Sequence, residues 1–151
     1  MRDALKGRTG KETAPAPVFS HATLGVLLPE PVLDFSAGGA GRLVVVFRSE
    51  YIGEGDPQLG GKLMQELLQA LLDHPEPPRA LLFYNSAVRL TQADSPVCGQ
   101  LRQLSERGSA LLICRSSLQA LLPGHQPVVG RTAAFAELTD EMRQARQLLW
   151  P

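Results

Sequence analysis

The chain has little cysteine: only Cys98 and Cys114 occur among its 151 residues. Two cysteines are too few for a disulfide framework, and they form no CxxC pair. Such sparse use of cysteine is typical of a protein kept in a reduced compartment. The three histidines, His21, His74 and His125, lie far apart in the sequence and make no i,i+4 pair. Metal-ligand spacing is therefore absent, and we expect no metal and no cofactor.

An excess of charge and a long apolar run are both missing as well. The 15 basic and 15 acidic side chains give a formal net charge of zero. A nucleic-acid binder normally carries a basic excess, so no nucleic-acid partner is expected. No apolar run approaches the roughly 18–20 residues that span a bilayer, and the N-terminus is too polar for a signal peptide. We therefore expect a soluble, cytoplasmic protein that makes no membrane contact.

Composition divides the chain into two parts. Residues 1–41 contain four of the prolines and end in the glycine cluster SAGGAG, with only one short apolar segment. This part is interpreted as a leader or linker without an independent core. Residues 42–151 are interpreted as one domain, because strand-like and helix-like patterns alternate there.

Buried strands are predicted where short apolar runs occur, and helices where apolar residues recur at helical spacing. A helix capped by Asp56 and Pro57 should end at HPEPP, and another should begin at Ser95 and Pro96. The predicted strands are 43–47, 80–84, 110–114 and 127–130; further helices are predicted near 116–122 and 134–149. This alternation predicts an α/β fold with a mostly parallel sheet and flanking helices. Chemistry in such folds collects at the carboxyl ends of the strands.

The loop YIGEGDPQLGGKL joins a predicted strand to a predicted helix, which is where phosphate sites occur. However, Leu63 follows Lys62 where a Walker A loop needs Ser or Thr, and Gln58 stands where a dinucleotide loop needs its third glycine. We favour a tight turn in which Gly53 and Gly55 serve backbone geometry.

Cys114 ends the predicted strand ALLIC, at the edge where α/β proteins place chemistry. Arg115 is adjacent, and a helix is expected to follow; both favour the nucleophilic thiolate. A lone cysteine at a strand end is also common as a small packing residue, so both interpretations stay open at this point. For Cys98, which falls beside Val97 on an apolar helix face, packing is favoured.

The order of four segments adds a resemblance. IGEGDPQLGGKLMQELLQAL, LLFYNSAVRLTQADSP, LLICRSSL and VVGRTAAFAEL occur in sequence over residues 42–147. This ordered set resembles the sulfur-relay family typified by DsrE and TusD. The strongest likeness is to the C-terminal domain of the sulfurtransferase-like selenium metabolism proteins of the YedF type. The resemblance implies a single DsrE-like three-layer domain over residues 42–151.

The resemblance also implies a site and a function. Cys114 matches the cysteine that carries a persulfide sulfur in this family, with Arg115 next to it. The surrounding loops match at five positions: Gly53, Gly55, Asp56, Asn85 and Ser86. The implied function is a persulfide carrier in sulfur or selenium metabolism. Its implied partners are a sulfur donor or acceptor such as a TusA-like carrier protein, and further copies of itself in a homo-oligomer.

Two departures from the family pattern motivate an alternative. Ser117 stands where the family has its second cysteine, and residues 1–41 contain no cysteine and are too short for a TusA-like domain. The alternative is a non-catalytic oligomeric binding or scaffold member, in which Cys114 only packs. A third and weaker hypothesis is a small-molecule or nucleotide site at the 53–57 loop.

Overall fold

The structure, a computed structural model, describes residues 42–151. The interpretation of residues 1–41 as a leader lies outside the described residues. Along the chain the elements are β1 (Leu43–Phe47), α2 (Pro57–Asp73), β2 (Ala80–Phe83), the 3-10 helix η1 (Asn85–Thr91), α3 (Cys98–Glu106), β3 (Ala110–Cys114), α4 (Arg115–Leu121), β4 (Arg131–Ala133), α5 (Phe135–Gln144) and β5 (Gln147–Leu149).

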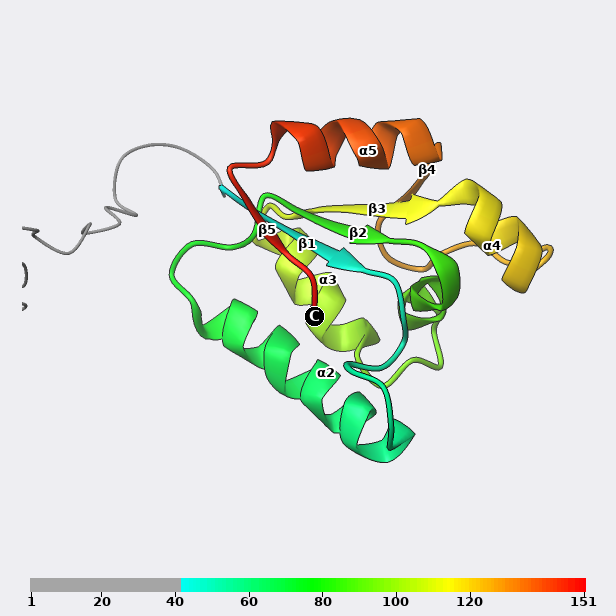
Figure 1. The fold of residues 1–151 in the computed structure, drawn as a ribbon, viewed down its shortest axis with the longest axis horizontal. Helices are drawn as coiled ribbons and strands as arrows, with labels where there is room; N and C mark the ends of the chain where they lie inside the picture. Colours follow the sequence, from blue (N-terminus) through cyan, green and yellow to red (C-terminus); the bar gives the residue numbers. More distant parts are fainter. Residues whose placement is uncertain (1–41) are drawn as a thin grey trace, which may run out of the picture. The chain divides into compact units, whose positions relative to one another are not determined.

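The five strands form one sheet in the order β4-β3-β2-β1-β5, and every neighbouring pair is parallel. Helices cover both faces: α2 and α3 lie on one side of the sheet and α5 on the other (Figure 1). The predicted α/β class is confirmed, with a sheet that is entirely parallel.

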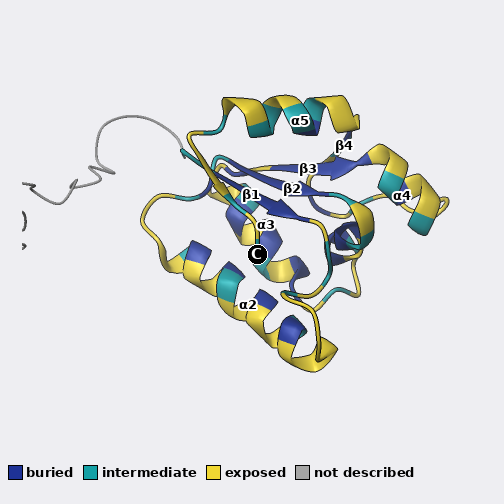
Figure 2. Cartoon of the chain, viewed as in Figure 1, coloured by how far each residue is buried: buried dark blue, intermediate teal, exposed yellow. Residues whose placement is uncertain are grey.

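The strands alternate between two cores, as the two-residue period of a strand requires. On β2, Leu81 and Phe83 pack in the core beneath α2 and α3, while Ala80 and Leu82 pack in the core beneath α5. Figure 2 shows buried strands and helices whose outer faces are exposed. The α5 core also contains the last residue of β3, Cys114, and this placement decides what surrounds its thiol.

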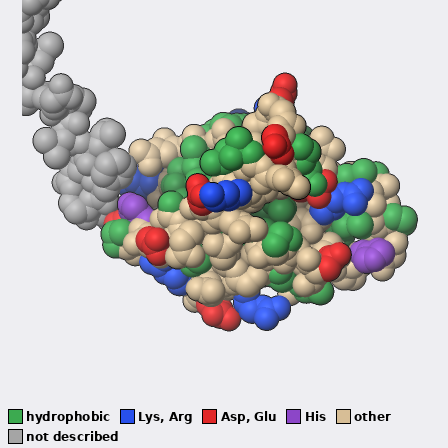
Figure 3. All heavy atoms as spheres, turned by 90° about the horizontal axis from the view of Figure 1, so that it is seen from below, with side chains coloured by type: hydrophobic (Ala, Val, Ile, Leu, Met, Phe, Trp, Pro, Cys, Tyr) green, Lys and Arg blue, Asp and Glu red, His purple; other side chains and the backbone are tan. Residues whose placement is uncertain are grey.

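The outer surface carries both signs of charge. Figure 3 shows the face that α2 and α3 cover, where acidic, basic and hydrophobic side chains are interspersed. On α2, for example, Lys62 and Glu66 form an exposed i,i+4 ion pair at 3.8 Å. At the edge of the sheet, Leu148 and Trp150 are 42% and 48% exposed.

The first half of the domain follows the sequence prediction closely. The carboxylate of Asp56 accepts hydrogen bonds from the backbone N–H groups of Gln58 (2.8 Å) and Leu59 (3.4 Å), which caps α2 as expected. The start of the next helix differs by two residues. Ser95 Oγ accepts from Val97 N at 3.4 Å within a preceding turn, and α3 itself begins at Cys98.

Two predictions near the C-terminus are wrong. Residues 127–130 form a loop, and the edge strand is Arg131–Ala133 instead. Gly130 has φ +79, a conformation that lets the chain turn just before the edge strand. A Cβ atom at this position would lie only 2.6 Å from Leu111 Cβ, so the backbone here packs directly on β3. The helix predicted to reach Leu149 ends at Gln144, because residues 147–149 pair with β1 as β5.

Candidate functional site

Cys114 is the last residue of β3 and the N-cap of α4, at the carboxyl edge of the sheet. Its neighbours in the sheet are β2 and β4, and its register partner on β4 is Ala133. The sequence predicted that Cys114 ends a strand and that a helix follows, and the structure confirms both. Loops after β1 and β2 leave the same edge, as parallel pairing requires.

The thiol of Cys114 faces inward, and the residue is only 2% exposed. It packs in the α5 core together with Leu112, Ala133 and Leu138. These neighbours are apolar, so their side chains give the sulfur no hydrogen-bond donor. In this conformation Cys114 fills core volume, and a donor molecule has no direct path to its sulfur.

An aromatic pair lies at the border of the same core. Tyr84 packs against the cluster that contains Cys114. Phe135, the first residue of α5, meets Tyr84 edge to face with 5.5 Å between ring centroids. Phe135 is 48% exposed, so about half of this side chain is in contact with solvent while it packs on Tyr84.

Asn85 and Ser117 connect the loop after β2 to α4. The backbone N–H of Asn85 donates to Ser117 Oγ at 2.9 Å, and Asn85 adopts a positive φ of 54°. Asn is one of the few residues that tolerate this left-handed conformation. Ser117 therefore has a structural role, because its hydroxyl ties the loop after β2 to α4. Ser86 is half-buried within η1.

Arg115 is exposed and lines a shallow groove of about 250 Å³ together with Gln119, His125 and Thr132. Cys114 does not line this groove. Nearby, the hydrogen bond from Arg131 lowers the pKa of Glu137 below its ordinary value, and the charge of Arg115 acts weakly in the same direction. The side chain of Arg115 thus lies in solvent, while Cys114 lies in the apolar core beneath α5.

The loop with Gly53, Gly55 and Asp56 has a backbone role. Both glycines have positive φ, at 78° and 144°, and open space surrounds them. The carboxylate of Asp56 occupies the N–H groups at the start of α2, which leaves no anion site there. Within residues 42–151, no hydrogen bond or ion pair joins this loop to Cys114, Asn85 or Arg115.

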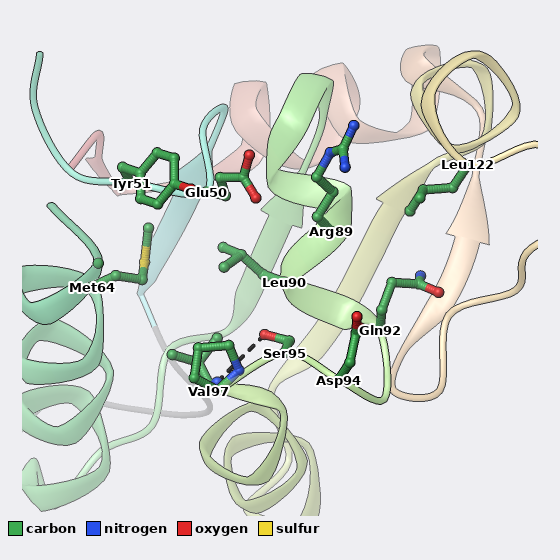
Figure 4. Close-up of a pocket in the computed structure, with 12 residues that line it drawn as sticks. Glu50, Tyr51, Met64, Arg89, Leu90, Gln92, Asp94, Ser95, Val97 and Leu122 are labelled. Atoms are coloured by element: carbon green, nitrogen blue, oxygen red, sulfur yellow. Dashed lines mark hydrogen bonds between the residues drawn. The ribbon is translucent and has the colours of Figure 1, made fainter. Parts of the chain in front are cut away.

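A larger pocket, of about 300 Å³, lies between the start of α2, the end of η1 and the start of α3 (Figure 4). Its polar lining includes Glu50, Arg89, Gln92 and Asp94. The sequence prediction missed this site, because its residues come from separate segments that share no motif. Only the fold brings them together.

In the part of the chain that the structure describes, no three His, Cys, Asp or Glu side chains gather to hold a metal ion. Both cysteines are free, and both are buried. None of the helices within residues 42–151 has the length and apolar character needed to cross a bilayer.

Comparison with known proteins supports the fold. The crystal structure of the YchN protein from E. coli, which has a DsrE-like fold, superposes with a TM-score of 0.52 and 13% sequence identity. The match covers 74% of this chain and 99% of that chain. No family model and no curated protein sequence matches the chain. The expected DsrE-like three-layer arrangement is thus confirmed as a fold.

Proposed function

We propose that this protein is a sulfur-relay protein that carries a persulfide sulfur on Cys114, in sulfur or selenium metabolism. The observation that carries the proposal is the position of Cys114: it ends β3 at the carboxyl edge of an all-parallel sheet with a DsrE-like fold. Open α/β sheets bind their ligands at this edge. The similarity to a solved structure supports a DsrE-like fold and no more. The proposal that the protein carries sulfur rests on the position of Cys114 within that fold.

The transfer would follow ordinary thiol–disulfide chemistry. The thiolate of Cys114 attacks the outer sulfur of a donor persulfide, R–S–SH. The donor S–S bond breaks, the donor leaves as a thiolate, and Cys114 becomes a persulfide. An acceptor thiolate then takes the outer sulfur and restores the Cys114 thiolate. Each exchange is redox-neutral, so it needs no cofactor.

Access to the sulfur requires a movement at the border of the α5 core. Cys114 is 2% exposed, and the aromatic pair of Tyr84 and Phe135 lies at the border of its core. Because Phe135 is the first residue of α5, fraying of one helical turn suffices to displace it. In the proposal, docking of a TusA-like carrier at this edge favours the open form.

The neighbouring polar groups have defined parts in this proposal. Ser117 accepts the N–H of Asn85 and so fixes the loop beside α4. Arg115 is solvated and free to turn toward an incoming anionic persulfide, since no hydrogen bond or ion pair holds its side chain in the described region. With no second cysteine at position 117, release depends on an acceptor protein and not on an internal disulfide.

Persulfide loading tests the proposal. The protein is incubated with a cysteine desulfurase and cysteine, and its intact mass is then measured under non-reducing conditions. Cys98→Ser should gain one sulfur atom, as the unaltered protein does, while Cys114→Ala should gain none. Cys114→Ala is the appropriate variant, because it keeps the site apolar within the core. Equal loading of Cys114→Ala, or no loading of the unaltered protein, would refute the proposal.

A second candidate function is favoured by one specific observation, the 2% exposure of Cys114 among aliphatic side chains. In this alternative the protein is a non-catalytic binding or scaffold member in which the cysteine only packs. Alkylation of the native Cys98→Ser variant distinguishes the two. Alkylation only as fast as global unfolding supports the scaffold function; alkylation much faster than unfolding supports the relay.

A further inference from the structure

The 300 Å³ pocket has a polar end and an apolar wall. Its apolar wall is formed by Met64, Leu90 and Val97, all of them at least 95% buried. At the other end, Figure 4 shows the carboxylate of Glu50 and the guanidinium of Arg89 directed toward the same side of the pocket. An apolar wall with a few converging polar groups is the usual composition of a small-molecule site.

The charged groups of the pocket are open to a ligand, because Arg89 and Asp94 are exposed and Glu50 is half-buried. No ion pair or side-chain hydrogen bond involves Glu50, Arg89 or Asp94 among residues 42–151. Gln92 differs, because its Nε2 atom is buried and has no hydrogen-bond partner. A buried donor without an acceptor is rare in folded proteins. This atom is not accessible to solvent, so a ligand in the pocket meets the charged groups of Glu50, Arg89 and Asp94 instead.

The segment that carries these groups is held by its own hydrogen bonds. The N–H of Gln92 donates to the carbonyl of Arg89 at 3.2 Å, and the N–H of Ser95 donates to the carbonyl of Gln92 at 3.1 Å. The N–H of Val97 then donates to Ser95 Oγ at 3.4 Å. Fixed turns place polar groups before a ligand arrives, which lowers the entropic cost of binding.

We infer that this pocket binds a small zwitterion of the amino-acid class with an apolar side chain. A guanidinium binds a carboxylate through two parallel hydrogen bonds, so Arg89 holds the ligand's carboxylate. The carboxylate of Glu50 or Asp94 holds its ammonium group, and the apolar wall takes its side chain. Ligand sites span about 300–1,000 Å³, so a pocket at the lower limit selects a small ligand. Cys114 does not line this pocket, and binding is therefore independent of the sulfur chemistry.

Isothermal titration calorimetry on the full chain, with L-leucine as the probe, tests the inference. Two analogues of L-leucine each carry only one of its two charged groups. 4-Methylpentanoate lacks the ammonium group, and 3-methylbutylamine lacks the carboxylate. Each analogue should bind at least roughly tenfold more weakly than L-leucine, the loss expected for one charge-assisted hydrogen bond. Arg89→Gln should weaken L-leucine by a similar factor and leave 3-methylbutylamine unchanged.

Arg102→Gln is the matched control, because Arg102 is exposed on α3 and does not line the pocket. It should bind L-leucine as the unaltered chain does. Three results would overturn the inference: no heat of binding with L-leucine up to its solubility, equal affinity for the two analogues and L-leucine, or equal weakening by Arg102→Gln and Arg89→Gln.

Discussion

Replacing Gly130 with alanine should destabilise the domain strongly, because this residue sets the approach of β4 to β3. Gly130 has φ +79, a conformation that side chains rarely adopt. A Cβ atom there would lie 2.6 Å from Leu111 Cβ, 2.7 Å from Ile113 Cδ1 and 2.7 Å from the Leu111 carbonyl oxygen. These atoms belong to β3, a central strand, so they cannot move aside cheaply.

Two costs add. The left-handed conformation costs a residue with a side chain about 1–2 kcal/mol. Overpacking against a core strand costs about 1–3 kcal/mol more. The free energy of unfolding should therefore fall by about 2–5 kcal/mol, a large part of the ~5–15 kcal/mol that stabilises a typical domain.

Gly124→Ala separates the two costs. Gly124 also has φ +79, but nothing lies within 4 Å of the position of its Cβ. The free energy of unfolding of Gly124→Ala should fall only by the cost of the left-handed conformation, about 1–2 kcal/mol. Equilibrium urea unfolding measures both variants, and Gly130→Ala should have a midpoint lower than that of Gly124→Ala by roughly 1 M. Equal losses in the two variants would refute the close approach of β4 to β3.

Two further predictions concern side chains around the candidate site. In a Cys98→Ser background, Phe135→Ala should speed alkylation of Cys114 by roughly two- to tenfold, because it removes an aromatic pair worth about 0.5–1.5 kcal/mol; a rate unchanged in a thiol-labelling time course would show that the pair does not limit access. The hydrogen bond from Arg131 lowers the pKa of Glu137 from its ordinary 4.5, so its contribution is full above that value and is lost as the pH falls through the lowered pKa. Thermal melts should therefore place Glu137→Gln below the unaltered protein at neutral pH and level with it in strong acid, whereas a gap that persists in acid would contradict the assignment.

The sequence predicted most of the fold because the decisive signals are local. A continuous run such as LVVVF can be a strand buried on both faces, and Asp56 with Pro57 marks a helix start from a few neighbouring residues. The failures are non-local. Residues 147–149 carry an apolar pattern compatible with a helix, but pairing with β1 makes them a strand. Gly130 ends a stretch that is strand-like in composition, yet its backbone is needed for a turn.

The sequence predicted where Cys114 lies in the fold, but not that its side chain would be buried among apolar residues. That Cys114 ends a strand follows from its local sequence, and the structure agrees. Which face its side chain occupies depends on the register of the whole sheet and on where α5 packs, and no single segment encodes that. For the same reason the sequence did not group Arg89 with Glu50, although both line one pocket.

Discharge of a loaded sulfur to an acceptor tests the relay most directly. The Cys98→Ser protein, loaded with one sulfur and freed of donor, is mixed with a TusA-like carrier, and both intact masses are followed over time. The relay predicts that one sulfur leaves Cys114 and appears on the carrier. A sulfur that never loads, or that stays on Cys114 while the carrier gains none, would contradict it.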